Sequence, residues 1–169
     1  MKSILISIRP QWCEKIASGK KTIEVRKSAP KEVPFKAYIY ETYDKKYDDI
    51  GICWGNGKCF EHGCKKVIGE FVCDYIDPFF DDKDACLSSE DVEKYANGKV
   101  VYGWHISDLE IYDKPLELSE FGRGCDAGHI KEIHCRDCKK PESFDDFCEV
   151  MCKPLNRPPR SWCYVEELL

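Results

Sequence analysis

Four polar side chains with useful chemistry lie close together near the N-terminus: Lys21, Thr22, Glu24 and Arg26. Alternate residues of a strand face the same side, so Thr22, Glu24 and Arg26 are predicted to share one face. Lys21 precedes them where the chain bends into the strand, and its amine is placed to reach the same face. A guanidinium holds phosphate or a base edge, and a lysine beside a carboxylate serves as a general base or polarises a carbonyl.

Glu70 adds a second carboxylate from another predicted strand. Together with Glu24 and Arg26 it has a simpler interpretation, a cross-strand ladder of ion pairs on a solvated face that contributes little energy. The residues alone leave both interpretations open.

The apolar patterning predicts many short strands and few helices. A helix over 10–18 begins at Pro10 and ends before Gly19, and a second over about 89–96 follows the capping residue Ser88. The predicted strands cover 3–8, 21–27, 34–43, 67–76, 100–106, 109–112 and 161–167. Two helices cannot cover a parallel sheet, so we expect a mainly β (α+β) protein, a small mixed or antiparallel β-barrel with two or three short peripheral helices.

The segment Gly19–Arg26, GKKTIEVR, resembles the G-x-K-T-x-E-x-R signature of the ASCH domain, a branch of the PUA-like superfamily. The order of the flanking segments is similar too, from a helix carrying Trp12 to the closing segment 161–167, as in bacterial and phage members. The resemblance covers roughly 1–121 and 156–169. It implies a PUA-like barrel with a cleft over the signature strand, and a role with RNA or modified nucleosides.

One branch of that family is similar to a bacterial amidohydrolase that deacetylates N4-acetylcytidine. The resemblance makes Lys21 and Glu70 the counterparts of its lysine and second-strand glutamate. Its nucleophile is a threonine three positions after the lysine, where this chain has Glu24. Thr22 lies two residues away from that position, about 7 Å along a strand. Lys21, Glu24 and Glu70 are therefore the catalytic candidates, and deacetylation is expected to be weak or absent.

Trp162 is the candidate for a stacking platform. Alternation places it with Tyr164 on one face of the last strand and puts Cys163 and Val165 on the other. An indole beside the signature strand would stack on a base. The alternative is a buried aromatic that only fills the barrel.

Cysteines are numerous, twelve in 169 residues, and the chain has no secretory signal, so metal binding is favoured over disulfides. Two close pairs, Cys135 with Cys138 and Cys148 with Cys152, predict a structural Zn²⁺ site. His129, His134 and Cys125 are possible substitutes as ligands. Reduced thiols in a loop, or a redox centre, are the alternatives.

A second cysteine group, Cys53, Cys59 and Cys64 with His62, is less regularly spaced and is interpreted chiefly as free thiols in a loop or hairpin. Four further cysteines fall at apolar or alternating positions and are predicted to pack in the core as small hydrophobic residues: Cys13, Cys73, Cys86 and Cys163.

Length and composition fit one domain with an insertion: a barrel over 1–121, a cysteine-rich insertion over 122–160 and a closing strand over 161–169. Apolar residues make up 43% and the longest early apolar run is too short for a membrane span, so a cytoplasmic protein is expected. The net charge of −5 argues against a protein that coats nucleic acid. Residues 1–36 nevertheless hold nine Lys/Arg against three Asp/Glu, a local +6.

Three functions follow from the sequence. The first is a module that binds RNA or a modified nucleoside through Lys21, Thr22, Glu24, Arg26 and Trp162. The second is a hydrolase, either an amidohydrolase on a nucleoside or a ribonuclease on phosphodiesters. The third is an adaptor whose cysteine-rich segment contacts another protein.

Overall fold

The computed structural model describes residues 1–47, 51–53, 59–61, 65–123 and 154–167. Within them the chain is mostly β, with two α-helices and two short 3₁₀ segments, η1 (Lys45–Tyr47) and η2 (Leu118–Glu120). No helix in these ranges is long and apolar enough to cross a membrane.

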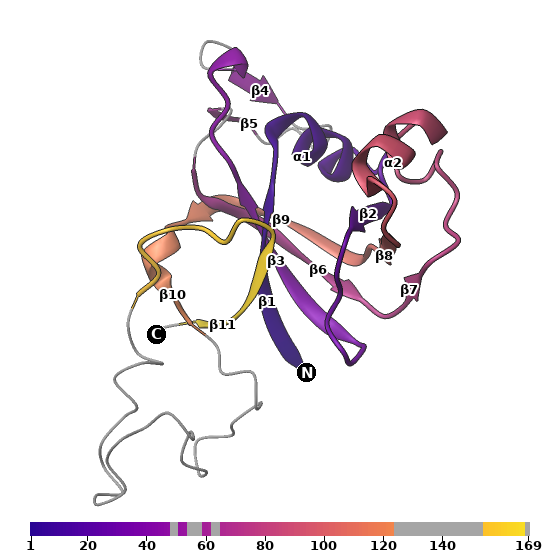
Figure 1. Ribbon diagram of the computed structural model, residues 1–169. Coiled ribbons are helices and arrows are strands. Elements are labelled where there is room, and N and C mark those ends of the chain that lie inside the picture. The colour runs from indigo at the N-terminus through magenta and orange to yellow at the C-terminus, as the bar shows by residue number, and fades with distance from the viewer. Residues whose placement is uncertain (48–50, 54–58, 62–64, 124–153, 168–169) are drawn as a thin grey trace, which may run out of the picture.

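The largest unit is a six-stranded mixed sheet in the order β10-β11-β1-β3-β6-β9. β1 and β3 are parallel, and every other pair is antiparallel. Its strands are β1 (Lys2–Ile8), β3 (Phe35–Glu41), β6 (Val67–Cys73), β9 (Ser107–Leu116), β10 (Phe121–Arg123) and β11 (Trp162–Glu167). β11 therefore lies next to β1, although the two are far apart in the sequence (Figure 1).

A second, three-stranded sheet has the order β2-β8-β7, with β2 (Ile23–Arg26), β8 (Tyr102–His105) and β7 (Ile76–Asp77). One hydrophobic cluster joins residues of both sheets, including Ile6, Ile39 and Phe71 from the large sheet and Trp104 from the small one. The main core therefore lies between the two sheets. No strand pairing among the described residues closes the sheets into the predicted barrel.

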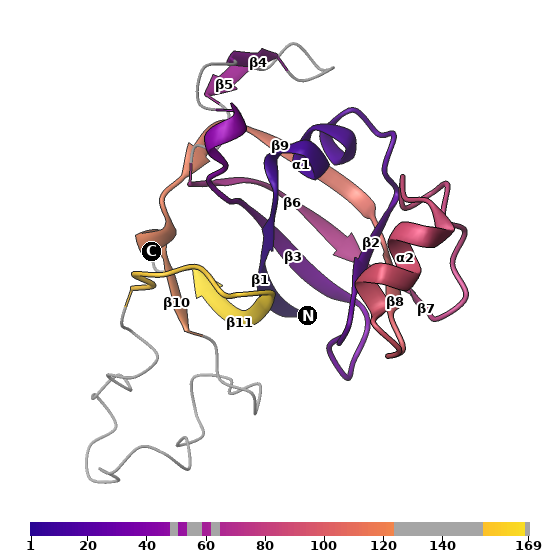
Figure 2. The ribbon, with the colours of Figure 1, turned by 45° about the horizontal axis from the view of Figure 1, so that its top comes forward.

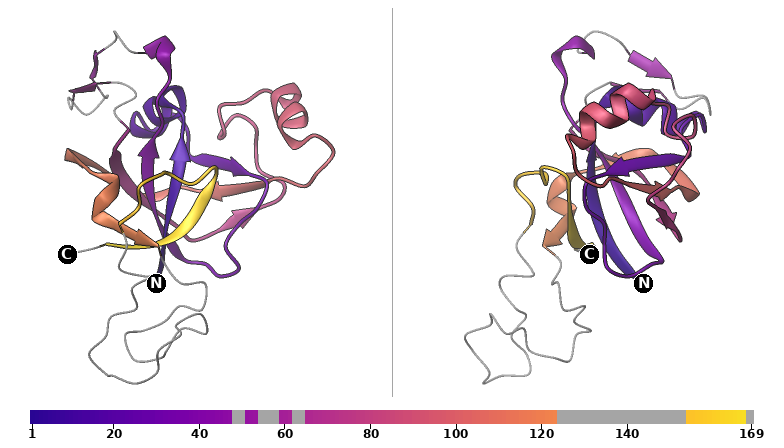
Figure 3. Two further views of the ribbon diagram at one scale, coloured as in Figure 1. Left: turned by 60° about the vertical axis from the view of Figure 1, so that its left-hand side comes forward. Right: turned by 45° about the vertical axis from the view of Figure 1, so that its right-hand side comes forward.

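Helix α1 (Pro10–Ala17) starts with proline at its first turn and packs Cys13 and Ile16 into this core. Helix α2 (Ser89–Ala96) is capped by Ser88, whose hydroxyl accepts a hydrogen bond from the Asp91 amide at 3.1 Å. α2 covers the outer face of the small sheet, on the side of the molecule away from β10 (Figures 2 and 3).

Both predicted helices are present, and each predicted strand corresponds to a strand of the structure, with some differences in bounds. The predicted strand 67–76 divides into β6 and β7, because the chain leaves the large sheet for the small one after Cys73. The predicted loop or hairpin at 44–64 contains a two-stranded hairpin, β4 (Gly51–Cys53) and β5 (Cys59–Glu61). The insertion begins inside β10, and its described ends meet, since Gly122 pairs with Pro154.

Candidate functional site

The two faces of β2 have different surroundings, which fixes where its polar side chains lie. Ile23 and Val25 pack outward against α2 and the segment before it, in a small cluster that contains Ala85. Glu24 is paired in register with Trp104, whose side chain is fully buried in the core between the sheets. Glu24 and Arg26 therefore project into the junction of the two sheets, as the alternation of the sequence predicts for these two residues.

Lys21 enters this junction from the end of α1 and is only 3% exposed. Its Nζ donates a hydrogen bond to the Ala85 carbonyl at 2.7 Å and lies 3.5 Å from Glu24 Oε2. The same ammonium lies 5.3 Å from the centre of the Trp12 ring. Burial lowers the pKa of Lys21 below its ordinary value, and the adjacent Glu24 carboxylate opposes that shift.

Arg26 connects the two sheets. Its Nη2 lies 2.9 Å from Glu24 Oε1 and donates to the Ser7 carbonyl of β1 at 2.7 Å, while Nη1 donates to Ser161 Oγ at 3.4 Å. Its Nε is buried and has no hydrogen-bond partner within the described part of the chain. Arg26 thus keeps one unused donor at a buried position.

Lys21, Glu24 and Arg26 are named here the cationic cluster. All three side chains are at least nine-tenths buried, and two cations share one carboxylate. The ion pairs found among the described residues give neither Lys21 nor Arg26 a second carboxylate partner. The cluster therefore carries a net positive charge in a buried environment.

Thr22 and Glu70, two further predicted site residues, lie outside this cluster. Thr22 is exposed, and its backbone pairs with Asp84 and Ile106. Glu70 lies on β6 opposite Tyr38, on the face of the large sheet that turns away from the small sheet. Its carboxylate accepts a hydrogen bond from Tyr112 Oη at 2.6 Å and lies 2.6 Å from Lys36 Nζ. The predicted cross-strand ladder on a solvated face therefore does not form, because Glu24 and Arg26 pair within β2 in a buried position and Glu70 lies on the other face of the large sheet.

Trp162 lies near the cationic cluster, and its predicted alternation is confirmed. Trp162 and Tyr164 pack against the core between the sheets, whereas Cys163 and Val165 pack on the opposite face. The indole N–H donates to Ser28 Oγ at 3.1 Å, and the ring is half-buried in edge contacts with Trp104 and Tyr164. The structure fixes this ring in place without a ligand.

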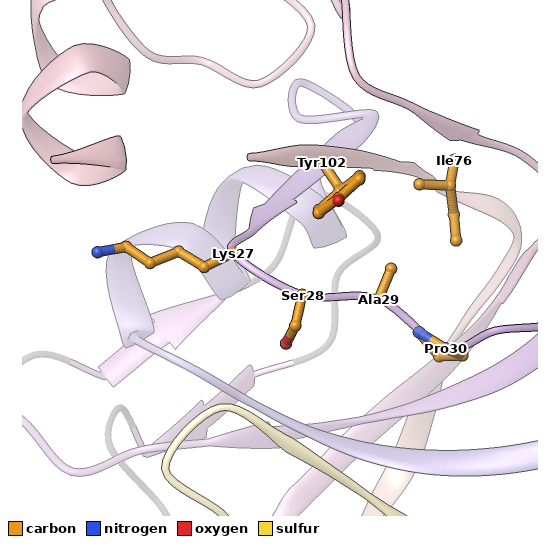
Figure 4. A pocket seen from close by; sticks show the side chains of 6 residues that line it. All are labelled: Lys27, Ser28, Ala29, Pro30, Ile76 and Tyr102. Carbon is orange, nitrogen blue, oxygen red and sulfur yellow. The ribbon is translucent and has the colours of Figure 1, made fainter. Parts of the chain in front are cut away.

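An open pocket of about 400 Å³ adjoins the end of β2 (Figure 4). It is lined by Lys27, Ser28, Ala29, Pro30, Ile76 and Tyr102. Sequence reasoning missed Ile76 and Tyr102, because only the pairing of β2 with β8 and of β8 with β7 brings them beside residues 27–30. Their apolar positions in predicted strands were the only available signal.

The predicted zinc ligands Cys135, Cys138, Cys148 and Cys152 lie outside the described residues, so the zinc site stays a prediction from the sequence. Cys53 and Cys59 are opposite each other in the backbone register of the β4–β5 hairpin. Cys64 and His62 lie outside the described ranges.

Cys13 and Cys73 are buried as predicted, whereas Cys86 and Cys163 are only half-buried. Burial raises the pKa of Cys73 to about 12, as expected for an unreactive core thiol. Within the described ranges, no three His, Cys, Asp or Glu side chains are grouped so that they could hold a metal ion.

Two sheets around one core, with a buried Lys-Glu-Arg cluster at their junction, define a small β-rich domain that is similar to solved ASCH structures. The similarity to a serine-to-alanine mutant of the ASCH protein from Zymomonas mobilis has a TM-score of 0.57 at 18% identity, over 98% of this chain and 89% of that chain. A tyrosine-to-phenylalanine mutant of the same protein gives a TM-score of 0.51 at 21% identity, over 70% and 77%. The unmutated protein gives 0.50 at 22% identity, over 69% and 74%.

This chain therefore has an ASCH-domain fold, as the signature at Gly19–Arg26 predicted. No protein-family model matches the chain, and no curated protein sequence matches it either.

Proposed function

We propose that this protein binds RNA, and that the cationic cluster holds an anionic group of the RNA, a backbone phosphate. The observation that carries this proposal is the excess of positive charge in the cluster, together with the unused Nε donor of Arg26. A buried charge without a counter-charge is costly, and a bound anion removes that cost.

The hydrogen-bond donors of the cationic cluster also suit a phosphate group. A guanidinium presents planar pairs of N–H groups that fit phosphate oxygens, and such charge-assisted hydrogen bonds are stronger than neutral ones. Arg26 is already oriented by Glu24 and by the Ser7 carbonyl, so little side-chain entropy is lost on binding. The resemblance of Gly19–Arg26 to the ASCH signature and the ASCH-domain fold support RNA, or a modified nucleoside, as the ligand.

Fluorescence anisotropy with a labelled single-stranded RNA tests this proposal. Arg26→Gln should weaken binding by about tenfold or more, the loss of a charged hydrogen bond, and should flatten the salt dependence. Lys114→Gln, which removes one positive charge from an exposed position on β9, is the matched control and should have a small effect. Equal losses in the two variants would mean that only the total charge matters and would refute the proposal.

Hydrolysis is a second candidate function, and the position of Lys21 Nζ, 3.5 Å from Glu24 Oε2, favours it. A lysine held beside a carboxylate would polarise the carbonyl of a nucleoside amide or stabilise the charge that develops on an RNA phosphodiester. Turnover of N4-acetylcytidine and cleavage of a labelled RNA should both be measured with wild type and Lys21→Met. Cleavage that disappears in Lys21→Met, while RNA is still bound, would establish this function. Rapid deacetylation would contradict the expectation drawn from Glu24.

A further inference from the structure

We infer that the pocket lined by residues 27–30, Ile76 and Tyr102 receives one unpaired RNA base, stacked on the Tyr102 ring, while the phosphate of that nucleotide lies on Arg26. This inference rests on the proposed function and adds the substrate class, single-stranded RNA, together with the position of a base.

The register of the small sheet places the two groups together. Tyr102 is the direct partner of Arg26 in the antiparallel pair of β2 and β8. Directly opposite residues project from the same face, with Cβ atoms about 4.5–5.5 Å apart. A base on Tyr102 therefore has its own sugar and phosphate within reach of the guanidinium.

The pocket walls suit a flat, uncharged ring. Ile76, Ala29 and Pro30 are apolar, and none of the residues that line the pocket is acidic. In Figure 4 Ala29 points toward Tyr102 and Ile76, while the Lys27 chain extends away from them. The Lys27 ammonium lies 5.0 Å from the centre of the Tyr95 ring, so this cation lies beside the pocket rather than in it. A pocket of about 400 Å³ is within the range of small-molecule sites.

The pocket is also preformed. Tyr102 is half-buried and packs against the core between the sheets, which fixes its ring. The hydrogen bond from Trp162 to Ser28 joins the loop that lines the pocket to β11. A rigid aromatic wall loses little entropy on binding, and every base can stack on it regardless of sequence.

Binding of three probes separates the base from the phosphate: a labelled single-stranded RNA hexamer, the same hexamer with abasic sugars, and inorganic phosphate. Tyr102→Leu keeps the apolar volume and removes the flat ring. It should weaken binding of the intact hexamer by about 5- to 150-fold, the range for one stacked base, and leave the abasic hexamer and phosphate unchanged. Tyr102→Phe should bind like wild type.

Tyr75→Leu is the matched control, because Tyr75 is 55% exposed and does not line the pocket. A hexamer containing 2-aminopurine gives a readout on wild type alone, since stacking on Tyr102 should quench its fluorescence. The inference is overturned if Tyr102→Leu binds the intact hexamer like wild type, or weakens intact and abasic hexamers equally, or if no quenching occurs. If Arg26→Gln still binds all three probes like wild type, the proposed function fails instead.

Discussion

Two clusters of charged and polar side chains lie on the two faces of the large sheet, and they use their carboxylates differently. In the cationic cluster, two cations share the single carboxylate of Glu24. On the other face, phenols and one lysine bind two carboxylates. This second group is named the tyrosine cluster and consists of Lys36, Tyr38, Glu70, Tyr112 and Glu167.

The difference lies in the balance of donors and acceptors. In the tyrosine cluster, Tyr38 donates to Glu167, and Tyr112 and Lys36 both bind Glu70. Each phenol donor is used, and the cluster is net negative. In the cationic cluster the donors outnumber the acceptors, and Arg26 Nε is unused within the described ranges. The polar groups of the tyrosine cluster thus satisfy one another, which suits a structural role, whereas the cationic cluster is suited to an anionic ligand.

Removing the central carboxylate should have the largest effect. Glu24→Gln leaves Lys21 and Arg26 buried without a counter-charge and should destabilise the protein by about 3–5 kcal/mol. Glu70→Gln should cost only about 1 kcal/mol, because the Glu70 side chain is 18% exposed and the new amide can still form hydrogen bonds. Chemical denaturation measures both values.

Added phosphate should partly restore the stability that Glu24→Gln loses. Because an anion can replace the missing charge, added phosphate should raise the Tm of Glu24→Gln more than that of wild type or Glu70→Gln. Equal stabilisation of all three proteins would contradict a specific anion site.

Alkaline pH should change the stability contributions of the two clusters in opposite directions. Burial lowers the pKa of Lys21 below 10.5, so the folded state releases this proton first, and the stability associated with Lys21 should increase as the pH rises toward 10.5. Burial and the neighbouring carboxylates raise the pKa of Tyr38 and of Tyr112. The stability that these two phenols contribute to the folded protein should therefore be lost as the pH rises above 10. Denaturation of Lys21→Met and Tyr112→Phe between pH 8 and 11, set against wild type, separates the two effects. Identical pH profiles for the three proteins would contradict these directions.

Removing one phenol should have a smaller effect. Tyr112→Phe deletes the hydrogen bond to Glu70 and should cost about 0.5–1.5 kcal/mol, while RNA binding stays unchanged. Equilibrium denaturation and anisotropy measure the two quantities. A loss of RNA affinity similar to that of Arg26→Gln would mean that the tyrosine cluster belongs to the binding site.

Changes in the cysteine-rich segment should have the smallest effect on the stability of the two clusters and on RNA binding. Protein purified without added metal should contain about one zinc per chain, and the double change Cys135→Ser with Cys138→Ser should remove it and expose 122–160 to protease. RNA binding through Arg26 should be unaffected. Elemental analysis decides the first point, and the absence of zinc from freshly reduced protein would refute the predicted site.

The sequence predicts local features of this molecule better than contacts between strands. Alternation was sufficient to place Glu24 and Arg26 on one face, and Trp162 with Tyr164 on another, because the period of a strand is a local property. It could not tell which face of β6 carries Glu70, since this depends on which strands pair and on irregularities in the pairing of β6 with β3 and β9. Nor could it place Tyr102 opposite Arg26, which requires the register.

The position of β11 in the large sheet has a consequence for synthesis of the chain on the ribosome. β1 lies between β3 and β11, so residues 2–8 obtain one neighbour early and the other only after residues 162–167 have been made. Until then the nascent chain presents the unpaired backbone of β1 as an open edge, to which another strand can add. Ser161, which contacts Arg26, arrives in the same step. The hydrogen bond from Arg26 to Ser161 therefore forms last, and translation that stops before residue 161 yields a protein in which this contact to the cationic cluster is missing.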